Sequence, residues 1–131
     1  MRVLVVDDIL TNRLLAERML ERRGHSVKTV KNGMEAICLL EQEDFDVVVM
    51  DIQMPIMDGI ETTKIIRNCK SQVRRHDIPV IAMSAVEECA GKKHCIESGM
   101  NGYLAKPLNI DIFYNTLERF APEFNSPASL D

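Results

Sequence analysis

Several short apolar runs in this sequence are each followed directly by a side chain that can take part in chemistry. Asp7 and Asp8 follow the first run, and Asp51 follows another. Ser84 and Lys106 follow two later runs. Two carboxylates about 4 Å apart repel by roughly 4 kcal/mol at an effective dielectric constant of about 20, so we expect a cation among the acids. Carboxylate oxygens suit Mg²⁺, which keeps positions open for phosphate oxygens.

Phosphoryl chemistry fits this set because its charges balance. The three acids carry −3, and Mg²⁺ together with Lys106 carries +3. The sequence contains no GxSxG elbow, P-loop, GxGxxG motif or paired Cys and His. A metal-bound aspartate that attacks phosphorus needs none of these, and Asp51 is the best candidate nucleophile. Ser84 would donate a hydrogen bond to the new phosphoryl group, and Lys106 would pair with another of its oxygens.

Each of these residues also has a purely structural interpretation. Asp8 could cap a helix, and Asp51 could end a strand in a turn. Ser84 could cap the next helix, and Lys106 could be an exposed surface lysine. Taken singly, these roles are the commoner ones. Their joint appearance after strands favours a shared site, because ligands of open parallel sheets bind beyond the carboxyl ends of the strands.

The apolar pattern predicts the strands that would bring these side chains to one edge. Continuous apolar runs are typical of strands buried on both faces, and they occur at 3–6, 47–50 and 80–83. Weaker strand candidates lie at 26–30 and 102–105.

Apolar residues at helical spacing predict a helix after each strand. The first spans 10–23, the second starts at Asn32-Gly33, and the fourth covers about 87–98 with few apolar residues. The third starts near Asp58-Gly59 and carries a predicted core stripe of Thr62, Ile65, Ile66 and Cys69. The fifth starts at the N-cap Asn109, and its stripe is Ile110, Phe113, Tyr114 and Leu117. Five β-α units with right-handed crossovers predict an α/β fold with a doubly wound, five-stranded parallel sheet and helices on both faces.

Composition predicts one globular domain. The chain has 131 residues, of which 46% are hydrophobic and 27% charged. We expect the domain at 1–121 and a flexible tail rich in Pro and Ser at 122–131. The net charge of −4 argues against nucleic-acid binding. No apolar run is long enough to span a membrane and no signal peptide is evident, so we expect a cytoplasmic protein.

Four cysteines, Cys38, Cys69, Cys89 and Cys95, form no CxxC pair. A metal cluster with His94 is the less favoured interpretation. Free thiols, with Cys69 and Cys89 packed on helix faces, are the expected state.

Over about residues 2–121, the chain resembles the receiver domain of two-component response regulators. The matching motifs are Val3–Asp8, Met50–Gly59, Ala82–Ala85 and Gly102–Pro107. The residues of the second motif are most similar to those in receivers of hybrid sensor histidine kinases. The resemblance implies a flavodoxin-like sheet of order 2-1-3-4-5 and phosphorylation of Asp51 by a histidine kinase or a histidine-containing phosphotransfer protein.

The resemblance also implies roles for individual residues. Asp8, Asp51 and the Gln53 carbonyl would bind Mg²⁺ directly, and Asp7 would act largely through water. Ser84 and Tyr103 would form a switch pair that reshapes the surface of helix 4, strand 5 and helix 5. The Lys106-Pro107 bond would be cis. The oligomeric state stays open.

Three alternatives compete with this interpretation. An aspartate-nucleophile phosphatase of the haloacid dehalogenase type needs a second acid two residues after its nucleophile, where this chain has Gln53. A flavodoxin needs a phosphate loop rich in hydroxyls and glycine, where this chain has Asp7 and Asp8. A receiver-like docking module would work without phosphorylation. We expect no classical enzyme, only catalysis of the chain's own phosphorylation and dephosphorylation, although the parent chain could be a hybrid histidine kinase.

Overall fold

The computed structural model describes residues 1–84, 93, 95–106 and 108–120. Its centre is a five-stranded parallel sheet of order β2-β1-β3-β4-β5. The strands are β1 (Arg2–Val6), β2 (Ser26–Val30), β3 (Val47–Asp51), β4 (Val80–Ser84) and β5 (Gly102–Ala105). The predicted doubly wound α/β fold, including its strand order, is confirmed.

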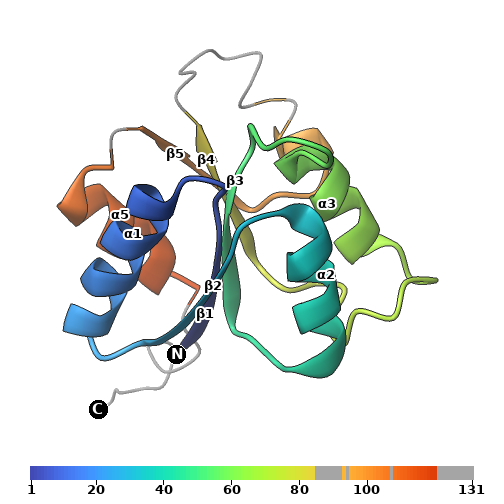
Figure 1. Ribbon diagram of the computed structural model, residues 1–131, viewed down its shortest axis with the longest axis horizontal. Helices are drawn as coiled ribbons and strands as arrows, with labels where there is room; N and C mark the ends of the chain where they lie inside the picture. The colour runs from blue at the N-terminus through green and yellow to red at the C-terminus, as the bar shows by residue number, and fades with distance from the viewer. Residues whose placement is uncertain (85–92, 94, 107, 121–131) are drawn as a thin grey trace.

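Helices cover both faces of the sheet (Figure 1). Those described are α1 (Leu10–Arg22), α2 (Gly33–Gln42), α3 (Gly59–Arg67) and α5 (Ile110–Glu118). Helices α1 and α5 lie on one face, and α2 and α3 lie on the other. Within the predicted helix at 87–98, residues 93 and 95–97 are helical, and 85–92 and 94 lie outside the described residues. The predicted tail at 122–131 lies outside them as well.

Alternating side chains of the strands feed two separate apolar cores. In β1, Val3 and Val5 pack in the core beneath α1 and α5, whereas Leu4 and Val6 pack in the core beneath α2 and α3. All five residues of β3 and all five of β4 are buried. Two-sided burial explains why these strands are continuous apolar runs.

Side-chain caps fix where several helices begin. Asp58 caps α3 in a reciprocal capping box, because its carboxylate accepts from the Glu61 amide and the Glu61 side chain accepts from the Asp58 amide. Asn109 caps α5 as predicted. The N-cap of α1 is Ile9, which makes no side-chain capping bond. The possible capping role of Asp8 is therefore not observed.

Two predicted core positions are wrong. Cys69 is exposed, because α3 ends at Arg67 and the Asn68 backbone turns extended. The Asn68 side chain then accepts from the Lys70 amide and closes a turn in place of a further helical turn. Ile110 is 53% exposed although it lies on the apolar stripe of α5, because the first turn of that helix lies beyond the core that covers Phe113.

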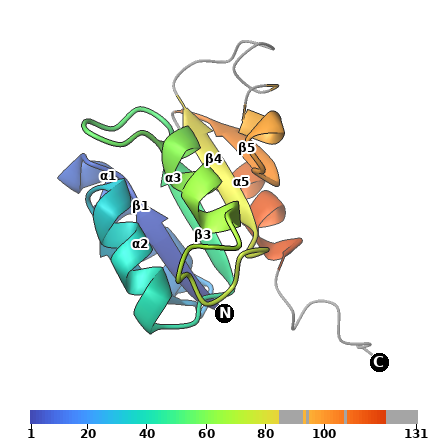
Figure 2. The ribbon, with the colours of Figure 1, turned by 90° about the vertical axis from the view of Figure 1, so that its right-hand side faces the viewer.

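Strand register brings the predicted site residues to one edge of the sheet. Val6 of β1 lies beside Met50 of β3, so the residues that follow β1 and end β3 are neighbours. Ser84 at the end of β4 pairs with Ala105 at the end of β5. In Figures 1 and 2 this edge is the upper end of the sheet.

Among the described residues, none of the helices has both the length and the apolar character that crossing a membrane requires.

Candidate functional site

Three carboxylates meet at the carboxyl edge of the sheet. Oxygens of Asp7, Asp8 and Asp51 all lie within 4.8 Å of one another. Asp7 and Asp51 are buried, with 0% and 3% exposure, whereas Asp8 is exposed. Solvent therefore reaches the cluster at Asp8, whereas the Asp7 and Asp51 side chains are shielded from it.

Lys106 joins two of these acids from the end of β5. Its Nζ lies 3.2 Å from Asp51 Oδ2 and 3.3 Å from Asp7 Oδ2. The Lys106 amide also donates to the Ser84 carbonyl at 2.8 Å, which ties the ends of β4 and β5 together. A single ammonium thus bridges two buried carboxylates and offsets part of their mutual repulsion.

The backbone orients both buried carboxylates. Asp7 Oδ1 accepts from the Ile9 amide at 2.9 Å, and Asp51 Oδ1 accepts from the Gln53 amide at 3.2 Å. Asp51 therefore also has the turn-forming role that the sequence suggested, because its Oδ1 closes a turn at the end of β3. In each residue the other oxygen, Oδ2, faces Lys106.

The electrostatic environment disfavours a charge on Asp51. Burial is the main cause that raises the pKa of the Asp51 carboxyl, and the nearby Asp7 carboxylate raises it further. Lys106 and the Gln53 amide lower this pKa but do not cancel the rise. A cation placed among the acids would favour the charged form of Asp51.

The other predicted site residues that the structure describes lie at or near the ends of β3, β4 and β5. Ser84 is buried at the end of β4. Tyr103 in β5 is half-buried, and its hydroxyl is buried without a hydrogen-bond partner among the described residues. Gln53 is exposed in the loop after β3. Pro107, and with it the predicted cis bond, lies outside the described residues.

Two contacts to the acidic cluster were missed by the sequence reasoning. Gly59, the first residue of α3, packs so closely beneath β3 that a Cβ there would lie 2.5 Å from the Asp51 carbonyl oxygen. Arg13 of α1 donates from Nη1 to the Asp7 carbonyl at 2.7 Å. The glycine directly after the Asp58 cap was a usable signal for the first contact. Nothing in the sequence marks Arg13.

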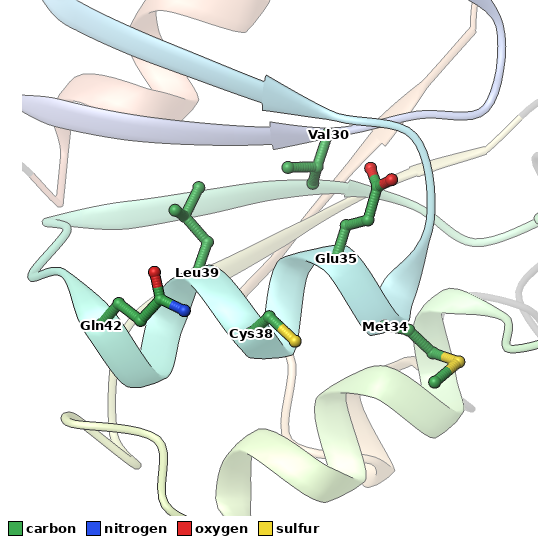
Figure 3. A pocket seen from close by; sticks show the side chains of 6 residues that line it. All are labelled: Val30, Met34, Glu35, Cys38, Leu39 and Gln42. Carbon is green, nitrogen blue, oxygen red and sulfur yellow. The ribbon is translucent and has the colours of Figure 1, made fainter.

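A pocket lies between α2 and the edge strand β2, and Figure 3 shows the side chains that line it. They are Val30, Met34, Glu35, Cys38, Leu39 and Gln42. The lining is mainly apolar, and Glu35 Oε1 already accepts from the Lys31 amide at 3.1 Å. This pocket has no set of converging polar groups comparable to the acidic cluster.

The chemistry of the acidic cluster fits a small hard cation. Three carboxylates offer oxygen ligands, two of them held in place by backbone amides, and the exposed Asp8 faces solvent. Mg²⁺ prefers one or two carboxylates together with water or phosphate oxygens. The residues present therefore fit Mg²⁺.

Comparison with known proteins identifies the family. The family model described as "Response regulator receiver domain" matches residues 3–118. The chain belongs to this family, and it is a receiver domain of two-component and phosphorelay signalling.

Several curated relatives of this chain are sensor kinases. The sensor protein GacS of Pseudomonas syringae is 40% identical over 108 residues, which cover 82% of this chain and 12% of that protein. The sensor histidine kinase RcsC of Escherichia coli is 36% identical over 121 residues, which cover 92% of this chain and 12% of RcsC. The predicted likeness to receivers of hybrid sensor histidine kinases is confirmed. Across the curated relatives that it matches, which also include plant and Dictyostelium histidine kinases, the chain spans only 7–15% of their length.

Solved structures share the fold. The receiver domain of the sensor histidine kinase PA1611 from Pseudomonas aeruginosa, which holds a magnesium ion in its active-site cleft, has a TM-score of 0.80 at 31% identity. That match covers 91% of this chain and 95% of the other. The receiver domain of Ssk1 from Saccharomyces cerevisiae, in complex with the histidine phosphotransfer protein Ypd1, has a TM-score of 0.83 at 27% identity. That match covers 92% and 88% of the two chains.

Proposed function

We propose that Asp51 accepts a phosphoryl group from a phosphohistidine donor in the presence of Mg²⁺. The observation that carries this proposal is the meeting of Asp7, Asp8, Asp51 and Lys106 at one edge of the sheet. Only Asp51 in this set both ends a central strand and contacts the ammonium group. The magnesium-bound receiver of PA1611 supports the same interpretation by likeness.

The chemistry follows from these positions. An Asp51 carboxylate oxygen attacks the phosphorus, and an acyl phosphate forms as the bond from phosphorus to the donor nitrogen breaks. The electron pair of that bond stays on the imidazole of the donor, which takes up a proton from solvent. Lys106, already 3.2 Å from Asp51 Oδ2, pairs with a phosphoryl oxygen, and Ser84 donates to another.

Bound Mg²⁺ would neutralise the charge that gathers on the phosphoryl oxygens. Asp8, Asp51 and the Gln53 carbonyl would hold it directly, with Asp7 acting through water. The rest of the site keeps the nucleophile aligned. The Gln53 amide fixes one Asp51 oxygen, and Gly59 allows α3 to approach the carbonyl behind it.

The proposed output is a population shift through Ser84 and Tyr103. The new phosphoryl group can accept several charge-assisted hydrogen bonds of about 1.5–3 kcal/mol each, and the one from Ser84 draws this side chain towards it. Two or three such bonds approach the roughly 5.5 kcal/mol that reverses a 1:99 equilibrium. The Tyr103 hydroxyl, which lacks a partner among the described residues, makes this side chain sensitive to such a change. The surface formed by helix 4, β5 and α5 would change with it.

The proposed partner is a histidine kinase or a histidine-containing phosphotransfer protein. Exposed apolar side chains next to the acidic cluster offer a contact surface on α1 and at its start, namely Ile9, Leu10, Leu14 and Leu15. The Ssk1 receiver domain bound to Ypd1 supports this class of partner by likeness. We place the exchange in the cytoplasm and assign it to a domain that ends near residue 121.

Intact-mass measurement after incubation with acetyl phosphate and MgCl₂ tests the proposal. We expect one added phosphoryl group on the wild-type chain, no addition in EDTA, and no addition to Asp51→Asn. The matched control Asp46→Asn alters an acid at the opposite end of β3 and should label like the wild type. Full labelling of Asp51→Asn would contradict the proposal. Absence of labelling in the wild type would favour a docking module that works without phosphorylation.

A further inference from the structure

The loop from β3 to α3 begins and ends against the proposed phosphoacceptor. At its start, the Gln53 amide donates to Asp51 Oδ1 at 3.2 Å. At its return, the Gly59 amide donates to the Ile52 carbonyl at 2.9 Å, and the Gly59 Cα lies beneath the Asp51 carbonyl. Figure 2 shows this green loop projecting away from the sheet at the edge that carries the acidic cluster. Both ends of the loop are therefore anchored at Asp51, whereas its middle projects away from the sheet.

Ile56 within this loop has an unfavourable backbone conformation. Its φ is +72°, the only positive φ of a non-glycine residue in the described part of the chain. The Met57 amide donates to the Pro55 carbonyl at 2.8 Å, so Ile56 is the central residue of a γ-turn with positive φ. This turn is rare and strained, and a β-branched side chain increases the backbone strain.

The Ile56 side chain is also in an unfavourable environment. It is 87% exposed, more than any other large hydrophobic side chain in the described residues. The loop cannot relax easily, because Met54 is buried in the core on one side and Gly59 is packed against Asp51 on the other. Strained residues persist only where their surroundings fix them, and they gather at functional sites.

We propose that Ile56 determines specificity for a protein phosphodonor over a small-molecule one. This inference rests on the proposed function. A phosphohistidine on the helical surface of a phosphotransfer protein must bring the surrounding surface to Asp51, where it covers Ile56. Burial of an exposed apolar side chain at such an interface strengthens the encounter. Acetyl phosphate reaches Asp51 without such a surface, so it gains nothing from Ile56.

The test compares two donors on matched variants. Phosphorylated Ypd1 and acetyl phosphate are each incubated with the chain and MgCl₂, and labelling is followed over time. Ile56→Asn removes the apolar side chain but suits a positive φ, and Ile56→Leu keeps an apolar side chain. Ile96→Asn is the control, because Ile96 is 55% exposed and precedes the amino end of β5, away from the acidic cluster.

We expect Ile56→Asn to lower the second-order rate constant with phosphorylated Ypd1 by about ten- to a hundredfold. Its rate with acetyl phosphate should stay within about twofold of the wild type, and its urea midpoint should not fall. Ile56→Leu should retain most of the Ypd1 rate, and Ile96→Asn should change neither rate.

Three results would overturn the inference alone. An unchanged Ypd1 rate in Ile56→Asn would show that no donor contact is made there. Equal losses with both donors would assign the turn a structural role only. A wild-type chain that accepts from acetyl phosphate but not from Ypd1 would contradict the inference and leave the proposed function intact. Failure with both donors would instead refute the proposed function, and this inference with it.

Discussion

Replacing Asp51 with Asn should stabilise the protein in the absence of Mg²⁺ at neutral pH. Oxygens of Asp7 and Asp8 lie within 4.8 Å of an Asp51 oxygen, so each repels it by about 3.5 kcal/mol or more at an effective dielectric constant of about 20. Lys106, at 3.2 Å, attracts Asp51 by about 5 kcal/mol on the same scale. Net repulsion is therefore about 2 kcal/mol, and burial adds to it. Because Asp8 is exposed and screened, we expect Asp51→Asn to raise the free energy of unfolding by about 1–2 kcal/mol.

The sign of the pH dependence follows from the raised pKa of Asp51. The folded state holds this proton more tightly than the unfolded chain does. The wild type therefore loses stability at this group as pH rises from the ordinary carboxyl pKa, about 3.9, through the raised folded pKa. The advantage of Asp51→Asn should vanish below the ordinary pKa and reach its full size above the folded pKa.

Urea unfolding in EDTA at several pH values measures this difference. Asp77→Asn is the control, because its carboxylate is exposed and pairs with the exposed Arg75, so its effect should stay within about 0.5 kcal/mol. Excess MgCl₂ should stabilise the wild type more than Asp51→Asn, because the variant has lost a ligand. Lower stability of Asp51→Asn in EDTA near neutral pH, or a gain of the same size in acid, would refute the electrostatic reasoning.

Three further substitutions test two contacts at the site and one at the opposite edge of the sheet. Lys106→Met leaves two buried carboxylates without their cation, so urea unfolding should show a loss of about 2–4 kcal/mol and acetyl phosphate labelling should slow by at least about tenfold. Gly59→Ala places a Cβ 2.5 Å from a backbone oxygen and should cost about 2–3 kcal/mol, whereas Gly102→Ala, whose nearest contact is at 3.5 Å, should cost less than about 1 kcal/mol by the same measurement. Arg67 donates two hydrogen bonds to the Gly99 carbonyl, so thermal and urea unfolding of Arg67→Ala should reveal a loss of about 2–3 kcal/mol that Arg67→Lys partly restores. If Lys106→Met, Gly59→Ala or Arg67→Ala is as stable as the wild type, the stabilising role assigned to that residue is contradicted.

The strands and the placement of the site could be predicted from the sequence for one physical reason. A parallel sheet covered on both faces needs continuous apolar strands, and such runs are visible at 3–6, 47–50 and 80–83. Once these strands are placed, the residue after each one must lie at the same edge. Asp51 and Lys106 lie 55 positions apart in the numbering, yet their side chains come within 3.2 Å.

Details that depend on packing between distant elements could not be predicted. Isoleucine ordinarily favours extended backbone, so no local pattern signals the positive φ of Ile56. The contact between Gly59 and the Asp51 carbonyl requires the actual height of α3 above β3. Helical spacing likewise cannot show that α3 stops before Cys69 or that the core fails to reach Ile110.

Locating the phosphoryl group tests the central claim most directly. Borohydride reduces an aspartyl phosphate to homoserine, and peptide mass mapping then identifies the modified position. After labelling with acetyl phosphate and MgCl₂, we predict homoserine at position 51 alone, with none formed when EDTA replaces the metal. Homoserine at position 7 or 8, or equal labelling without Mg²⁺, would contradict the account of Asp51 as the metal-dependent phosphoacceptor.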